Sequence, residues 1–177
     1  ELVEDSGSAT LSLEAQRLTL AGQSFEHFSL SGEGDRGQHR VELALDGLPG
    51  RLGARIDGGL SPKADLWRGT LLALALEPRD HPAWRLREPA AISLAPRSGT
   101  FTLEDACLDA APAFACLSAD SASGALEGEL ALQDFDLAQL TPLLGGGSDP
   151  GFALRGELDA TAQVSRSAAG ALRGHLS

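Results

Sequence analysis

Apolar and polar residues alternate along most of the chain. The alternation is clearest over residues 10–15, 41–45, 101–104 and 154–160. A period of two places every second side chain on the same face of a β-strand. Clusters of Gly, Ser, Asp and Pro separate these runs at short intervals, and many short strands joined by turns are typical of all-β proteins. The pattern therefore predicts an all-β fold.

A short motif recurs within this pattern: an apolar residue, any residue, Gly, any residue, Leu. Its four copies begin at Trp67, Leu126, Leu154 and Leu172. Glycine inside a strand usually marks a bulge, a bend or a close approach of backbones, so the repeated copies predict a sheet that curls. Their irregular spacing does not indicate a strict solenoid repeat. Ordinary entry into a strand after a turn explains the motif equally well.

One segment departs from the strand pattern. Leucines from Leu137 to Leu144 have helical spacing, a preceding Asp can cap the first turn, and Pro142 limits the length. The sequence predicts one short helix near 136–144. The Gly-rich stretch that follows predicts a flexible loop over 145–151.

The low aromatic content, six Phe and two Trp, favours an extended apolar sheet face over one tightly closed core. The chain carries 25 acidic and 14 basic residues, for a net charge of -11. This balance argues against a nucleic-acid partner, which needs clustered Lys and Arg, and against docking on anionic lipid surfaces. Many soluble proteins are acidic simply to stay dispersed.

The chain contains no Met and no apolar run of about eighteen residues, the length of a membrane span. Its first residues lack the basic region of a signal peptide. We therefore expect residues 1–177 to form a single internal segment of a longer protein.

Catalytic and metal-binding patterns are missing. The four His are scattered without zinc-site spacing, and neither a phosphate-binding loop nor a Gly-x-Ser-x-Gly elbow is present. Carboxylate pairs such as Glu104 with Asp105 could in principle do acid/base work, but charge on the wet face of a strand explains them as well. We expect no enzyme activity, no catalytic residues, no metal and no cofactor.

Cys107 and Cys116 are the two cysteines of the chain. Two thiols without a nearby His are too few for a metal site, and redox centres normally use Cys-x-x-Cys. A spacing of nine suits a hairpin in which Cys107 ends one strand, residues 109–113 turn, and Cys116 begins the next. Facing positions can then form a disulfide, which requires an oxidising compartment such as a bacterial periplasm. Two free buried cysteines are the alternative.

An ordered set of features in the middle of the chain resembles the TamB family, the inner-membrane component of the bacterial translocation and assembly module. The set runs from Trp67-x-Gly69-x-Leu71 through Trp84 and the Pro-Ala that follows it, then the two cysteines, then the leucine-rich segment at 140–144. The resemblance is strongest over residues 66–145. The flanks match only as generic strands of TamB and AsmA-like proteins.

The resemblance implies a fold, a location and partners. Such proteins of Gram-negative bacteria are anchored in the inner membrane, span the periplasm, and fold as a long, curved, taco-like sheet with an apolar concave groove. They act with a TamA-like outer-membrane barrel in the assembly of outer-membrane proteins, autotransporters among them, and they resemble bridge-like proteins that carry phospholipid. The resemblance therefore implies phospholipid acyl chains or nascent outer-membrane β-strands as cargo. Contact with the barrel partner is expected through other parts of the parent protein.

The alternation nominates residues that would line such a groove, although each could equally be ordinary core. The candidates are Leu11, Leu13, Leu43, Leu45, Leu72, Leu74, Leu76, Phe101, Leu103, Leu130, Leu132, Leu154 and Leu158. We expect Trp67 and Trp84 to pack on the sheet or its lip. A structural or adhesive β-solenoid with a filled core is the main alternative. A carbohydrate-active enzyme would require exposed aromatic residues and convergent carboxylates.

Overall fold

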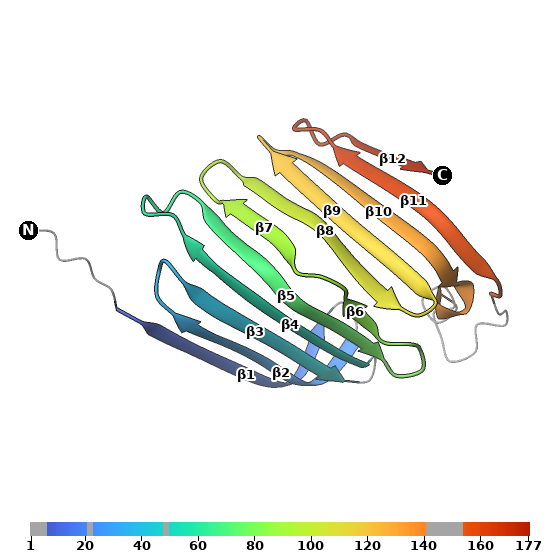
Figure 1. The fold of residues 1–177 in the computed structure, drawn as a ribbon, viewed down its shortest axis with the longest axis horizontal. Coiled ribbons are helices and arrows are strands. Elements are labelled where there is room, and N and C mark those ends of the chain that lie inside the picture. Colours follow the sequence, from blue (N-terminus) through green and yellow to red (C-terminus); the bar gives the residue numbers. More distant parts are fainter. Residues whose placement is uncertain (1–6, 21–22, 48–49, 141–153) are drawn as a thin grey trace, which may run out of the picture.

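A computed structural model describes residues 7–20, 23–47, 50–140 and 154–177. These residues form one antiparallel sheet of twelve strands (Figure 1). The strands are β1 (Ala9–Leu20), β2 (Gln23–Gly34), β3 (His39–Gly47), β4 (Gly50–Leu60), β5 (Trp67–Pro78), β6 (Trp84–Leu86), β7 (Ala90–Ala95), β8 (Thr100–Ala110), β9 (Ala113–Ala122), β10 (Ala125–Asp136), β11 (Glu157–Arg166) and β12 (Leu172–Leu176). The spatial order follows the chain order, and β6 and β7 share the place between β5 and β8. The predicted all-β fold is confirmed.

The predicted short helix is present as a single 3₁₀ turn, η1 (Leu137–Leu140). Asp136, the first residue of the predicted helix, ends β10. Residues 141–144 and the predicted loop over 145–151 lie outside the described residues. The division into one segment over 1–177 stays a prediction.

The described strands form a single layer. Each contacts mainly its neighbours in the sheet, and η1 is the only helix described. The accessible surface is 12103 Å², against about 8,100 Å² for a compact protein of this mass, 18.3 kDa. Within the described ranges only six hydrophobic residues are buried, and none has its side chain wholly out of contact with solvent.

Strand pairing sorts the side chains into two faces, because residues directly opposite each other in neighbouring strands share a face. Leu13, Leu30, Leu43, Ala54 and Leu74 are paired in succession from β1 to β5. Four small or apolar residues continue in the same way from β8 to β11, namely Leu108, Ala115, Leu132 and Ala160. We call the face that carries these two rows the apolar face and the other the polar face.

Irregularities in the ladders keep the leucines on one face. Register shifts occur between Phe25 and His27, between Leu103 and Ala106, between Leu132 and Phe135, and in β5, where Leu71 pairs with Ile56 while Ala73 pairs with Arg55. At each shift one strand carries one extra residue, which is the definition of a β-bulge. In β5 the extra residue is Leu72.

These bulges do not coincide with the glycines of the repeated motif, so the motif glycines within strands do not mark bulges. Gly69 has a different role: a Cβ on it, or on Gly58 in the next strand, would collide with the ring of Trp67. A Cβ on Gly128 or on Gly174 would make only an ordinary van der Waals contact, with the backbone carbonyl oxygen of Ser118 at 3.7 Å or of Gln163 at 3.8 Å.

Two small clusters hold the buried hydrophobic residues, both on the apolar face. Leu71, Ala90 and Ala106 form the first, where the bulges of β5 and β8 flank the junction of β6 and β7. The second centres on Trp84, whose ring stacks on that of Phe135 with centroids 5.9 Å apart. Close packing is therefore confined to the centre of the sheet and one end of its strands.

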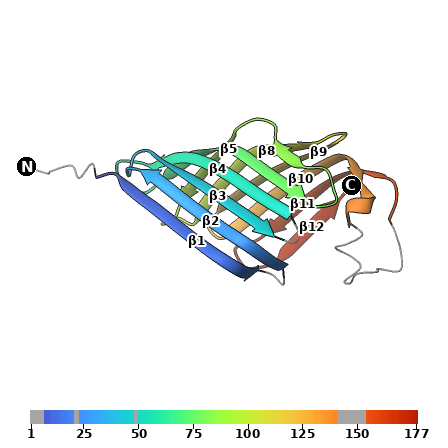
Figure 2. The same cartoon turned by 90° about the horizontal axis from the view of Figure 1, so that it is seen from below.

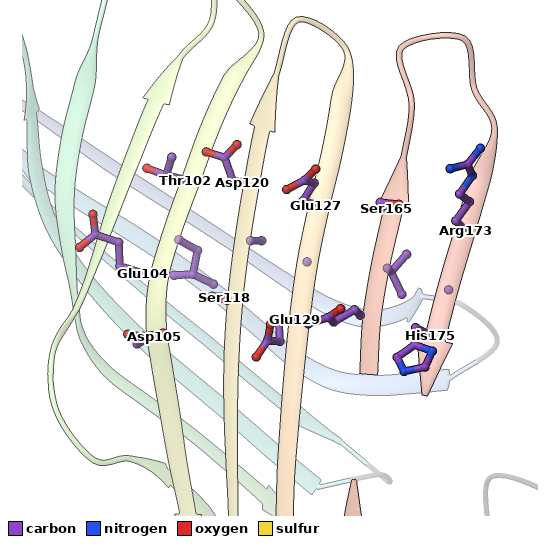
Figure 3. Close-up of a pocket in the computed structure, with 16 residues that line it drawn as sticks. Thr102, Glu104, Asp105, Ser118, Asp120, Glu127, Glu129, Ser165, Arg173 and His175 are labelled. Carbon is purple, nitrogen blue, oxygen red and sulfur yellow. Dashed lines mark hydrogen bonds between the residues drawn. The ribbon is translucent and has the colours of Figure 1, made fainter. Parts of the chain in front are cut away.

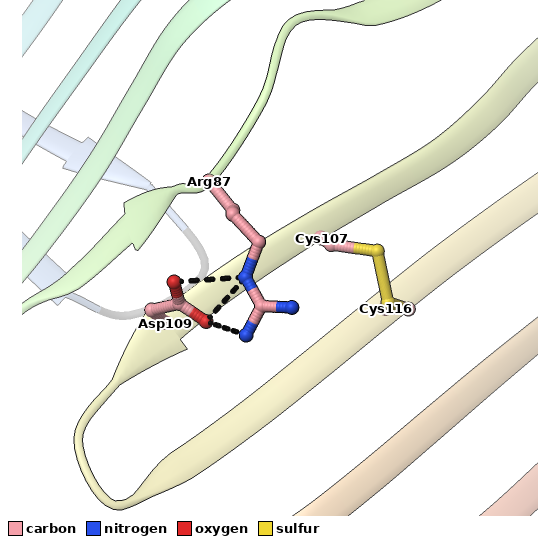
Figure 4. Close-up of a disulfide and its surroundings, with 4 residues drawn as sticks. All are labelled: Arg87, Cys107, Asp109 and Cys116. Carbon is pink, nitrogen blue, oxygen red and sulfur yellow. Dashed lines mark hydrogen bonds and ion pairs between the residues drawn. A yellow bond between two sulfur atoms is a disulfide. The ribbon is translucent and has the colours of Figure 1, made fainter.

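The predicted disulfide joins Cys107 to Cys116, which are directly opposite in β8 and β9 (Figure 4). The strands continue to Ala110 and from Ala113, so the turn has two residues and is shorter than expected. The bridge lies on the polar face, the same face as Asp109. There Arg87 binds Asp109 through Nη2 and Oδ1, 2.6 Å apart, and its guanidinium lies 4.2 Å from the ring centroid of Phe114.

We predict that replacing both cysteines by serine lowers the free energy of unfolding by about 2–3 kcal/mol, because the bridge restricts a ten-residue loop in the unfolded chain. Urea titrations of the oxidised protein and the double variant measure the difference. The reduced wild-type protein should have the same urea midpoint as the double variant. Equal midpoints for oxidised and reduced protein would refute the prediction.

We also predict unequal costs for two leucines of the same face. Leu71 is 7% exposed and Leu13 is 51% exposed. Leu71→Ala should lower the free energy of unfolding by about 2–3 kcal/mol, because it leaves a cavity, whereas Leu13→Ala should cost less than about 1 kcal/mol. Similar losses in urea titrations would mean that the apolar face near β1 is covered in the folded protein.

Candidate functional site

The apolar face gathers nearly all of the predicted groove residues. Pairing places on it Leu11, Leu13, Leu43, Leu45, Leu74, Leu76, Phe101, Leu103, Leu130, Leu132 and Leu158. Leu154 precedes β11 and takes part in no strand. Leu72 is the extra residue of the β5 bulge, so the position opposite Ile56 belongs to its neighbour Leu71.

Every large apolar side chain that the structure describes as exposed lies on this face. They are Leu11, Leu13, Leu94, Leu117, Leu126, Val164, Leu172 and Leu176. Exposure reaches 72% at Leu176. Monomeric soluble proteins rarely expose a contiguous apolar patch of more than a few hundred Å², and larger patches usually mark an interaction site. The apolar face is therefore the candidate functional site.

Six of these eight exposed residues were missed from the sequence. Leu126, Leu172 and Leu176 belong to the repeated motif, so a rule that every motif copy shows the same face would have found them. Val164 and Leu117 lie in weakly alternating segments rich in Ala and Ser, where no apolar phase stands out.

Two tryptophans lie on the apolar face near opposite ends of β5. Trp67 begins the strand and its indole N–H donates to Nε2 of His39, 2.7 Å away. Trp84 is paired with Leu76 near the other end, and its indole N–H donates to Oε1 of Gln139 at 3.4 Å. Both rings contribute apolar surface while their N–H groups are satisfied. This agrees with the expected packing on the sheet or its lip.

The polar face is held together by ion pairs between neighbouring strands. Arg40 and Asp57 are directly opposite, and Nε lies 2.7 Å from Oδ1. The hydrogen bond from Arg40 lowers the pKa of Asp57 and raises that of Arg40. The hydrogen bond from Arg87 likewise lowers the pKa of Asp109. These pairs are exposed, and exposed pairs contribute little each, so they favour the register more than the stability.

A hollow of about 790 Å³ lies over β8–β12 (Figure 3). Polar-face residues around it form two rows across the strands, Thr102, Asp120, Glu127, Ser165 and Arg173 in one and Glu104, Ser118, Glu129, Gln163 and His175 in the other. Leu103, Ala119 and Val164, which pairing assigns to the apolar face, lie between the two rows and also line the hollow. Its carboxylates are exposed, and none of the described residues that line it is a Phe or Trp that could stack on a sugar. The hollow therefore supplies the acids that a carbohydrate-active site needs and lacks its stacking surface.

No group of three or more His, Cys, Asp or Glu is placed to hold a metal ion within the part of the chain that is described. Over the same ranges no helix is long and apolar enough to cross a membrane.

Comparison with protein families gives one result. The model described as TamB, N-terminal domain, matches residues 3–177. No curated protein matches, and no solved structure matches. Because the match spans nearly the whole sequence and includes all strands of the sheet, the chain belongs to the TamB family.

Proposed function

We propose that the chain is a non-enzymatic periplasmic scaffold whose apolar face lines a groove for phospholipid acyl chains on their way between the two membranes. One observation carries the proposal: all the exposed large apolar side chains described lie on one face of a single-layer sheet. In a soluble protein such a face requires an occupant that removes it from water.

Family membership supports the proposed location and the proposed role. It connects the chain with outer-membrane biogenesis and lipid transport, with an inner-membrane-anchored protein that spans the periplasm, and with a TamA-like outer-membrane partner. We propose that contact with that partner is made by other parts of the parent protein. The disulfide is consistent with the oxidising periplasm.

The shape of the sheet supports a groove. Seen from below, β1–β5 lie in front of β8–β12 and do not continue in their plane (Figure 2). The bulges provide a cause, because each bulge bends its strand and increases the local twist. We propose that the apolar face lies on the inside of this bend, where the ring contact of Trp84 with Phe135 reaches from β6 to β10.

The energetics favour an acyl chain. Burial of a methylene group is favourable by about 0.8 kcal/mol. Ten methylenes that lie half-buried on an open face would therefore contribute about 4 kcal/mol. That is enough to hold a lipid while allowing it to leave.

A nascent outer-membrane β-strand is a second candidate cargo, and a different feature favours it. Strand β1 forms one edge of the described sheet, it spans Ala9–Leu20, and it contains no Pro. An unpaired edge of this kind can accept an extended strand by backbone pairing. Protein cargo would therefore bind at the edge, whereas lipid would bind on the face.

A structural solenoid with a filled core is less well supported. It requires the inward leucines to be buried against a second layer. Leu11, Leu13 and Leu117 are instead more than 40% exposed, and each described strand contacts mainly its neighbours in the sheet.

We predict that photo-crosslinkers on the two faces give different adducts in the full-length protein in cells. Leu74 and Leu117 lie on the apolar face, and their neighbours Ala73 and Ser118 face the other way. Crosslinkers at Leu74 and Leu117 should capture phospholipid, identified by mass spectrometry, whereas those at Ala73 and Ser118 should not.

The other outcomes are also informative. Outer-membrane protein adducts on the apolar face in place of lipid would replace lipid transport with client binding. Intramolecular adducts alone at Leu74 and Leu117 would mean a filled interior, and the scaffold would then be structural. Equal lipid adducts on both faces would show that the apolar face has no special role.

A further inference from the structure

The apolar face carries almost no polar groups. Among the residues that pairing places on it along β3–β12, only His39, Ser121 and Arg166 have polar side chains. His39 accepts the indole N–H of Trp67, and the hydroxyl of Ser121 donates to the carbonyl of Gly99. Arg166 is the one ionised group of this set. Its guanidinium makes no ion pair, hydrogen bond or ring contact with any described residue.

The position of Arg166 is set by the ladders. It is the last residue of β11 and lies directly opposite Leu126 on one side and Leu172 on the other. The row continues through Ser121 to Phe101. The turn that begins at Ser167 follows at once, and the backbone amide of Ala171 closes it by donating to the hydroxyl oxygen of Ser167. Arg166 therefore stands at the rim of the apolar face.

Its nearest apolar neighbours are among the most exposed in the protein. Leu172 is 71% exposed, and Val164, two residues before Arg166 on the same strand and face, is 45% exposed. An exposed cation next to uncovered leucines is complementary to an amphiphile whose anionic head is joined directly to an acyl tail. A neutral lipid or an apolar peptide would leave the cation without a partner.

We propose that Arg166 binds the phosphate of a phospholipid headgroup while the acyl chain lies on Val164, Leu126 and Leu172. The inference rests on the proposed lipid-binding function and adds a specificity-determining residue to it. A guanidinium presents its N–H donors in a planar fork that matches two phosphate oxygens. The net charge of -11 repels anionic lipids at long range, so a preference for them must come from a local contact of this kind.

The test compares two fluorescent lipids with the same acyl chain. NBD-labelled lysophosphatidylglycerol carries a phosphodiester, and the corresponding NBD-labelled monoacylglycerol does not. Binding to the full-length protein is measured by fluorescence titration at low and high salt. The variants are Arg166→Gln, Arg166→Lys and Arg173→Gln. Arg173 is the matched control, because it lies opposite Ser165 on the polar face, one strand away.

We expect the wild-type protein to prefer the phosphodiester about five- to tenfold, the effect of one charge-assisted contact. Arg166→Gln should abolish that preference and leave the affinity for monoacylglycerol unchanged. Arg166→Lys should keep most of the preference, and Arg173→Gln should keep all of it. High salt should weaken the preference, because the contact is exposed.

Four results would overturn the assignment. If both lipids bind and Arg166→Gln leaves their ratio unchanged, the headgroup role fails while the proposed function stands. If Arg173→Gln lowers the ratio of the two lipid affinities as much as Arg166→Gln does, the preference comes from the overall charge of the protein and not from a contact with Arg166. If inorganic phosphate alone displaces the phosphodiester lipid, the site binds a free anion. If neither lipid binds to the wild-type protein, the proposed function fails together with the inference.

Discussion

The fold depends on the strict pairing of neighbouring strands, because a single-layer sheet has no second layer whose packing would help to fix the register. A slip of one residue between two strands would turn every leucine of one strand from the apolar face to the polar face. The structure fixes the register from the polar side. Arg40 with Asp57, Arg51 with Asp46, and the disulfide each join positions that are directly opposite. A slip would break these contacts, and it would also turn the polar side chains of the slipped strand onto the apolar face.

The bulges follow from the same constraint. In β5 the motif residues Trp67, Gly69 and Leu71 have odd numbers, whereas the leucines that follow them, Leu74 and Leu76, have even numbers. In a regular strand the two sets would lie on opposite faces. Both sets lie on the apolar face because Leu72 is an extra residue between them. The same change of phase occurs in β8 between Leu103 and Ala106, and in β10 between Leu132 and Phe135, and each has a register shift at that point. A sequence that changes phase within one strand therefore requires a bulge if its face is to stay uniform.

This argument separates what the sequence could predict from what it could not. Alternation predicted the all-β class, and the cysteine spacing predicted the hairpin disulfide, because both depend on local geometry. Strict alternation, assumed through the whole strand, nominated Leu72 as a groove residue in place of Leu71. The change of phase was visible in the sequence, but the bends were predicted at the motif glycines and not at the change of phase. Arg166 could not be found in the same way, because its isolation on an apolar face depends on which strands lie beside β11.

The sheet therefore presents two surfaces with different physical demands. On the polar face, charges are paired across strands, and exposed pairs of this kind can be made and kept in water at little cost. On the apolar face, seven described leucines remain 36–72% exposed, and water contact is unfavourable for each of them. A second sheet would remove that cost permanently, whereas a mobile amphiphile removes it only while bound. A scaffold that must release its cargo is better served by the second arrangement, because each apolar contact along the face is weak and the next one along the sheet is equivalent.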